Sequence, residues 1–152
     1  MKRVLFVCTG NICRSPMAEA LLRSEIAAAA PDLAVESLSA GVFASDGMPA
    51  SRCAVEALDE LGVDLRYFHS QPVTSELVAK SDVIFVMTRQ HRDTLVSWYP
   101  EVREKVFLLK EFGNPPSSGD VADPYSYSLA VYRQCRDEIR ACIPGIIKFL
   151  KQ

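Results

Sequence analysis

Short apolar runs alternate with stretches of helical periodicity along the whole chain. The apolar runs cover residues 4–7, 33–38, 83–87 and 106–109. The first, third and fourth are continuous, which is typical of strands buried on both faces. Strands that alternate with helices favour right-handed crossovers and a parallel sheet. The pattern therefore predicts an α/β fold, a doubly wound four-stranded parallel sheet with flanking helices.

Four stretches between and after these runs have helical spacing. The first helix should begin near Pro16, and the second should end at Gly62. The third is expected over residues 89–98, with Thr88 as N-cap and Pro100 as terminator. The fourth shows an apolar stripe near the C-terminus, made of Leu129, Tyr132, Ile139, Ile143, Ile146, Ile147 and Leu150.

Two segments depart from this regular alternation. Pro144 and Gly145 lie inside the last helical pattern. Proline costs a helix interior about 3 kcal/mol, so we expect a kink or break there. Residues 113–128 form the longest irregular stretch, with three prolines and two glycines. A loop of this length in a compact domain is usually functional.

Length and composition indicate an ordinary globular protein. The 152 residues are 49% hydrophobic and 24% charged, and no repeat or linker divides them, so we expect a single domain over residues 1–152. The net charge of −2 and the absence of a Lys/Arg run argue against a nucleic-acid partner. No segment has the apolar length of a membrane span. We expect a cytoplasmic monomer or weak dimer without membrane contact.

The five cysteines do not form a recognisable metal or disulfide pattern. Only Cys8 and Cys13 are close neighbours in the sequence, and neither paired C-x-x-C units nor zinc-like Cys/His clusters are present. The odd number of cysteines argues against a secreted disulfide framework. We therefore expect no metal and no cofactor.

The candidate chemistry lies in residues 8–15, which we call the anion loop. Its sequence is Cys-Thr-Gly-Asn-Ile-Cys-Arg-Ser, between the first strand and the first helix. Ligands of open α/β sheets bind beyond the carboxyl ends of strands, where free N–H groups and the helix dipole attract anions. The loop lacks the Gly-Lys-Ser/Thr ending of nucleotide hydrolases and the three glycines of dinucleotide-binding loops.

The anion loop instead carries a nucleophile and a cation. Cys8 opens the loop, where N–H groups and a guanidinium favour its thiolate, the form that attacks. Arg14 offers a planar fork that matches two oxygens of a phosphoryl group. This combination predicts phosphoryl transfer through a covalent intermediate without a metal. Asp123, in the long loop, is the candidate proton donor and later the base that activates water.

Residues 7–19, read with Asp123-Pro124-Tyr125, resemble the low-molecular-weight protein tyrosine phosphatase family. The resemblance extends over essentially the whole chain in length and element order. It implies that Cys8 is a nucleophile forming phosphocysteine, that Arg14 binds the phosphoryl oxygens, and that Asp123 is general acid and then general base. It also implies a phosphorylated protein as the substrate.

The resemblance assigns roles to the other loop residues as well. Ser15 would donate a hydrogen bond to the Cys8 thiolate, and Asn11 would hold a strained turn, for which asparagine is suited. Tyr125 would line the mouth of the site and pack on the substrate side chain. Cys13 would trap oxidised Cys8 in a reversible disulfide. The phosphate would be bound by Thr9, Gly10, Asn11, Ile12, Cys13 and Arg14.

A second resemblance concerns the substrate. Residues 39–45 and 87–91 are similar to bacterial arginine phosphatases of the same family, which typically carry Thr in place of Ile12 and Phe in place of Tyr125. Isoleucine favours a flat aryl ring, whereas a small polar residue can face a guanidinium. Because specificity resides in the site, we predict phosphotyrosine as substrate and keep phosphoarginine as the alternative. Phe43 is a further candidate rim residue.

Two other functions fit the sequence less well. A thioredoxin-coupled arsenate reductase, which the loop also resembles, needs further cysteines to relay a disulfide, and residues 80–112 contain none. A non-catalytic phosphate-binding module would lack the nucleophile or the acid, but both are present here.

The remaining polar candidates are interpreted as structural. Neither His69 nor His91 has a second metal ligand nearby in the sequence, which favours a surface or supporting role. Cysteines in helical patterns are usually core residues, and arginines along a helix usually form a solvated face. The cysteines interpreted as core residues are Cys53, Cys135 and Cys142. The arginines interpreted as a solvated face are Arg133, Arg136 and Arg140.

Overall fold

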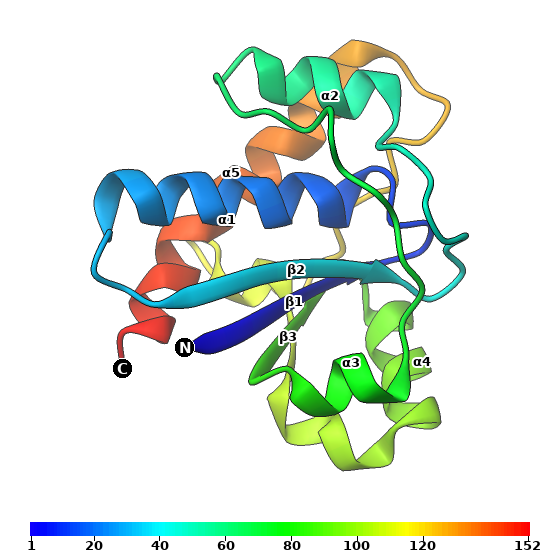
Figure 1. The fold of residues 1–152 in the computed structure, drawn as a ribbon, viewed down its shortest axis with the longest axis vertical. Coiled ribbons are helices and arrows are strands. Elements are labelled where there is room, and N and C mark those ends of the chain that lie inside the picture. Colours follow the sequence, from blue (N-terminus) through cyan, green and yellow to red (C-terminus); the bar gives the residue numbers. More distant parts are fainter.

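Four parallel strands form the centre of the fold, as the apolar runs predict (Figure 1). The computed structural model describes all residues from 1 to 152. The strands lie in the order β2-β1-β3-β4. Their bounds are β1 (Lys2–Cys8), β2 (Val35–Gly41), β3 (Val83–Val86) and β4 (Val106–Leu108). Because all pairings are parallel, the strands end at the same edge of the sheet.

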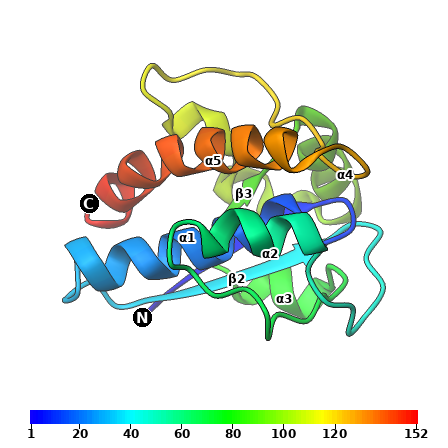
Figure 2. The same cartoon turned by 90° about the horizontal axis from the view of Figure 1, so that it is seen from above.

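Helices cover both faces of the sheet, which confirms the doubly wound arrangement (Figures 1 and 2). On one face lie α1 (Arg14–Ala29), α2 (Arg52–Asp59) and α5 (Leu129–Leu150), which share the larger apolar core. On the other face lie α3 (Ser75–Lys80) and α4 (Arg89–Trp98), over a smaller core. Two 3-10 helices, Pro100–Lys105 and Leu109–Phe112, flank β4.

Local signals set the ends of several helices. Helix α4 has the predicted bounds, and the Thr88 hydroxyl accepts the His91 backbone N–H at 3.1 Å, as an N-cap should. Gly62, with φ of +73°, follows α2 in the left-handed conformation that suits glycine. Helix α3 was not predicted, because its six residues are too few for a helical period to emerge. Its N-cap is Thr74, which accepts the Leu77 N–H at 3.1 Å.

The predicted break at Pro144 is wrong, since α5 runs uninterrupted from Leu129 to Leu150. Pro144 lies on the exposed side of the helix, where the carbonyl it leaves unpaired can bind water. Gly145 packs so closely on the backbone of Phe112 that an added Cβ would overlap the Phe112 carbonyl oxygen. Packing of the apolar stripe therefore holds the helix together across the proline.

The expectation that the α5 arginines are solvated is wrong for Arg136. This side chain is buried, and its Nη1 donates to the Ala57 carbonyl at 2.8 Å and to Glu60 at 2.6 Å. Arg133 also pairs with Glu60, at 2.6 Å. The two arginines thus tie α5 to the C-terminal end of α2.

The three cysteines outside the anion loop differ in burial. Cys135 and Cys142 are core residues as predicted, whereas Cys53 is only half-buried. No helix has the length and apolar character needed to cross a membrane. His, Cys, Asp and Glu side chains nowhere gather in groups of three or more that could hold a metal ion.

Candidate active site

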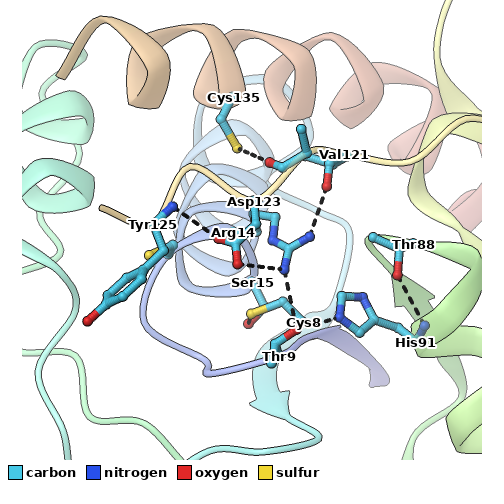
Figure 3. A network of polar contacts seen from close by, with 12 residues as sticks. Cys8, Thr9, Arg14, Ser15, Thr88, His91, Val121, Asp123, Tyr125 and Cys135 are labelled. Carbon is cyan, nitrogen blue, oxygen red and sulfur yellow. Dashed lines mark hydrogen bonds and ion pairs between the residues drawn. The ribbon is translucent and has the colours of Figure 1, made fainter. Parts of the chain in front are cut away.

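The anion loop lies at the carboxyl end of β1 and passes directly into α1, which begins at Arg14 rather than at Pro16 (Figure 3). Asn11 turns the loop with φ of +55°, the left-handed conformation expected for it. Its buried amide donates to Ser15 Oγ at 2.8 Å and to Ser39 Oγ at 3.0 Å. The Gln71 backbone N–H donates to Asn11 Oδ1 at 2.8 Å. These bonds hold the turn in place.

The end of β2 supports the loop from the side. Gly41 lies so close that an added Cβ would overlap the Thr9 carbonyl oxygen and lie 2.9 Å from the Asn11 nitrogen. The Phe43 backbone N–H donates to the same carbonyl at 2.9 Å. The Phe43 side chain itself is 78% exposed. Its backbone supports the anion loop, and its ring does not line the cavity of the site.

Cys8 is buried at the base of the loop. Its Sγ lies 3.0 Å from Ser15 Oγ. Because Ser15 Oγ already accepts a hydrogen bond from Asn11, its own proton is available to the sulfur. The Ala40 carbonyl, at 3.5 Å, is a more distant acceptor for that proton. Ser15 can therefore stabilise a negative charge on Cys8.

Arg14 connects the anion loop to the segment that carries Asp123. Its guanidinium is almost fully buried, and Nη1 donates to the Val121 carbonyl at 2.9 Å. Nη2 lies 3.4 Å from Thr9 Oγ1 and 3.7 Å from Asp123 Oδ2, while Nε has no partner. The Nε–Nη2 edge thus keeps N–H donors for an anion in the loop.

Asp123 belongs to the long segment 113–128 and lies at the cavity of the anion loop. Its Oδ2 forms the ion pair with Arg14, and its Oδ1 accepts the Tyr125 backbone N–H at 3.1 Å. The side chain is 52% exposed, so it can exchange protons with water. The Val121 N–H, which donates to the Met87 carbonyl at 2.8 Å, fixes this segment beside the end of β3.

A cavity of about 170 Å³ lies between the anion loop and the segment that carries Asp123. The structure thus brings together most of the predicted site residues. Asn11 and Ser15 support the loop without lining the cavity, and Phe43 lies outside it. The lining residues are Cys8, Thr9, Gly10, Ile12, Cys13, Arg14, Asp123 and Tyr125.

Cys13 faces two hydroxyl groups on its buried side. Its Sγ lies 3.1 Å from the Tyr132 hydroxyl and 3.5 Å from Ser51 Oγ. Burial raises the pKa of the Cys13 thiol, an effect that these hydrogen bonds partly offset. Burial also raises the pKa of Tyr132. The sequence pattern identified Tyr132 only as a core position.

His91 is the site residue that sequence reasoning underestimated. It is 5% exposed, and its Nε2 lies 2.9 Å from Thr9 Oγ1. Burial, with a smaller effect of the Arg14 charge, lowers the pKa of His91 to about 4. The available signal was topological, because a residue just after β3 lies beside the end of β1 in this strand order.

The fold and this site together define a small α/β phosphatase. The family model for low molecular weight phosphotyrosine protein phosphatase matches residues 3–152. The chain belongs to that family.

Relatives of the chain carry two different substrate names. The chain is 45% identical to the protein-arginine-phosphatase of Bacillus subtilis (strain 168), over 98% of this chain and 97% of the relative. It is 37% identical to the probable low molecular weight protein-tyrosine-phosphatase EpsP of Ralstonia nicotianae, over 92% and 90%. The solved low molecular weight protein tyrosine phosphatase of T. tengcongensis superposes with a TM-score of 0.90 at 41% identity, covering 98% of this chain and 99% of that one.

Proposed function

We propose that this phosphatase hydrolyses phosphotyrosine in proteins through a phosphocysteine on Cys8. In the first step the Cys8 thiolate attacks phosphorus, an S–P bond forms, and the bond between phosphorus and the tyrosine oxygen breaks. Asp123 gives its proton to the departing oxygen. The support for this step is the cavity that Cys8, Arg14 and Asp123 share.

Arg14 and the loop N–H groups stabilise the charge on the phosphoryl oxygens in both steps. In the second step Asp123 takes a proton from water, whose oxygen attacks phosphorus. The S–P bond breaks, and inorganic phosphate and the Cys8 thiolate are released. The hydroxyl of Ser15, 3.0 Å from the sulfur, stabilises the thiolate as it leaves.

The choice of phosphotyrosine over phosphoarginine rests on the position of Ile12 and Tyr125. Both line the cavity next to the phosphate position and offer apolar surface to a phenyl ring. A guanidinium placed between them would lose hydration, and buried unpaired polar groups discriminate strongly between substrates.

A second candidate substrate is phosphoarginine. The Asp123 carboxylate lies at the same cavity and could accept a hydrogen bond from a guanidinium. The 45% identity with the protein-arginine-phosphatase of Bacillus subtilis adds to this candidate.

Hydrolysis of one peptide, phosphorylated either on tyrosine or on an arginine at the same position, tests the two candidates side by side. We expect a higher kcat/KM for the phosphotyrosine peptide. A higher value for phosphoarginine would show that the second candidate is correct. The Cys8→Ser protein serves as the control for contaminating phosphatase, since it should release no phosphate from either peptide.

We further propose that Cys13 protects Cys8 from irreversible oxidation. Peroxide oxidises Cys8 to a sulfenic acid, the Cys13 thiol attacks that sulfur, and a disulfide and water form. Both thiols line the cavity. All five cysteines of the chain are free, which fits a reducing compartment such as the cytoplasm. After peroxide treatment, dithiol reductant should restore the wild type more fully than Cys13→Ser, because a Cys8 sulfenic acid without a neighbouring thiol is oxidised further to the irreversible sulfinic acid. Equal recovery of both proteins would exclude this role.

A further inference from the structure

The Thr9 hydroxyl lies between the guanidinium of Arg14 and the buried imidazole of His91 (Figure 3). Thr9 follows Cys8 in the anion loop and lines the same cavity as Arg14. Its Oγ1 lies 2.9 Å from His91 Nε2 and 3.4 Å from Arg14 Nη2. The direction of these hydrogen bonds decides where the hydroxyl proton of Thr9 points.

The surroundings of His91 indicate which ring nitrogen carries the proton. The ring is neutral near pH 7, because burial and the Arg14 charge lower the pKa of His91 to about 4. The neutral ring has a single N–H. Nδ1 is buried without a partner. A buried N–H without an acceptor is rarer than a buried acceptor without a donor, so we assign the proton to Nε2.

With this assignment, the hydrogen bonds at Thr9 can be counted. Its oxygen accepts two, one from His91 Nε2–H and one from an Arg14 Nη2–H. Arginine has no acceptor atom, so the direction of the second bond is fixed. Both lone pairs of Oγ1 are then occupied, and the hydroxyl proton is left for a third partner. The cavity that Thr9 lines is where an anion would lie.

We propose that His91 is a positioning residue that directs the Thr9 hydroxyl proton toward the phosphoryl group in the anion loop. The inference rests on the proposed function, since it concerns the same bound phosphate. It adds one side-chain donor to the loop N–H groups and Arg14. His91 contacts no substrate, and its effect passes entirely through Thr9. The backbone N–H of His91 in turn donates to Thr88 Oγ1 at 3.1 Å, which fixes the backbone of the histidine.

The test measures binding of inorganic phosphate by calorimetry, and kcat/KM on a phosphotyrosine peptide, in a double-mutant cycle. Thr9→Val removes the hydroxyl with little change in shape, and His91→Leu removes the ring donor. Hydrogen bonds to charged groups contribute enough that each variant should bind phosphate about tenfold more weakly. The double variant should be no weaker than Thr9→Val alone, because His91 acts through Thr9.

Two conservative variants and one matched control keep the result interpretable. Thr9→Ser retains a hydroxyl and should keep most of the phosphate affinity that Thr9→Val loses. His91→Gln retains an N–H donor and should keep most of the affinity that His91→Leu loses. His69→Leu makes the same substitution at the other histidine, which is exposed and does not line the cavity of the anion loop. It should bind phosphate like the wild type. Thermal unfolding of each variant identifies any protein that fails to fold.

Three results would overturn the inference. The first is that Thr9→Val binds phosphate as tightly as the wild type. The second is that the losses from Thr9→Val and His91→Leu add in the double variant. The third is that His91→Gln loses as much affinity as His91→Leu. Calorimetry requires no turnover. A wild type that binds phosphate but hydrolyses no phosphopeptide would therefore count against the proposed function and not against the Thr9–His91 pair.

Discussion

Replacing Ile12 by threonine should move substrate preference from phosphotyrosine toward phosphoarginine. Ile12 is half-buried and lines the cavity with Tyr125. The change removes two carbon groups from the rim and adds a hydroxyl. At about 0.8 kcal/mol per buried CH₂, and with half of each group buried, a phenyl ring loses roughly 0.8 kcal/mol of contact. A guanidinium gains a hydrogen bond of about 0.5–1.5 kcal/mol. Together these change the ratio of kcat/KM values by roughly 10- to 50-fold.

The assay is steady-state hydrolysis of matched phosphotyrosine and phosphoarginine peptides by the wild type, Ile12→Thr and Ile12→Val. Valine and threonine have nearly the same shape, so the difference between the two variants isolates the hydroxyl. Ile12→Val should keep the preference of the wild type, whereas Ile12→Thr should shift the ratio. The reasoning about the rim is refuted if Ile12→Thr and Ile12→Val give the same ratio.

Three further predictions concern other parts of the structure. Asp123→Ala should lower kcat/KM on phosphotyrosine by roughly 10²–10⁴-fold and much less on an aryl phosphate with a good leaving group, in steady-state assays; an equal loss on both would exclude proton donation. Gly41→Ala should abolish phosphate binding in calorimetry while circular dichroism stays native, because the added methyl overlaps the Thr9 carbonyl; retained binding would contradict this. Hydrogen bonds from Arg133 and Arg136 lower the pKa of Glu60 from 4.5 to about 2, so its contribution to stability is present above pH 4.5 and is lost as pH falls toward 2. Urea unfolding of Glu60→Gln should show a weaker pH dependence in this range, and an unchanged dependence would show that the ion pairs contribute nothing.

The fold and the anion loop could be predicted from the sequence because their signals are local. Continuous apolar runs locate the strands, and the Thr88 cap and Pro100 define α4 to the residue. The spacing of Cys8 and Arg14 within one loop places a thiol and a guanidinium at one helix N-terminus. Asp123 is a candidate from the sequence because it lies in an unusually long loop of a chain that also carries the Cys8–Arg14 loop, and the structure brings it to the same cavity.

The features that sequence reasoning missed depend on contacts between distant segments. Arg136 is buried because α2 ends beside α5, and no pattern within α5 indicates this. Pro144 stays inside a helix because packing of the apolar stripe, with Gly145 against Phe112, outweighs the local cost of the proline. His91 contacts Thr9, 82 positions away in the sequence, from the first turn of α4, just after the neighbouring strand β3. Each of these contacts is set by the order of strands and helices in space.

Trapping of a phosphoryl group on Cys8 tests the mechanism most directly. The wild type is mixed with a phosphotyrosine peptide, denatured within milliseconds, and examined by mass spectrometry of the intact protein and its peptides. The mechanism predicts a transient mass increase of one phosphoryl group, located on Cys8, and none in Cys8→Ala. Asp123→Ala should accumulate the intermediate for longer when the substrate has a good leaving group, since the second step then lacks its base. Rapid turnover with no phosphoryl group on Cys8 at any time, or turnover that persists in Cys8→Ala, would contradict it.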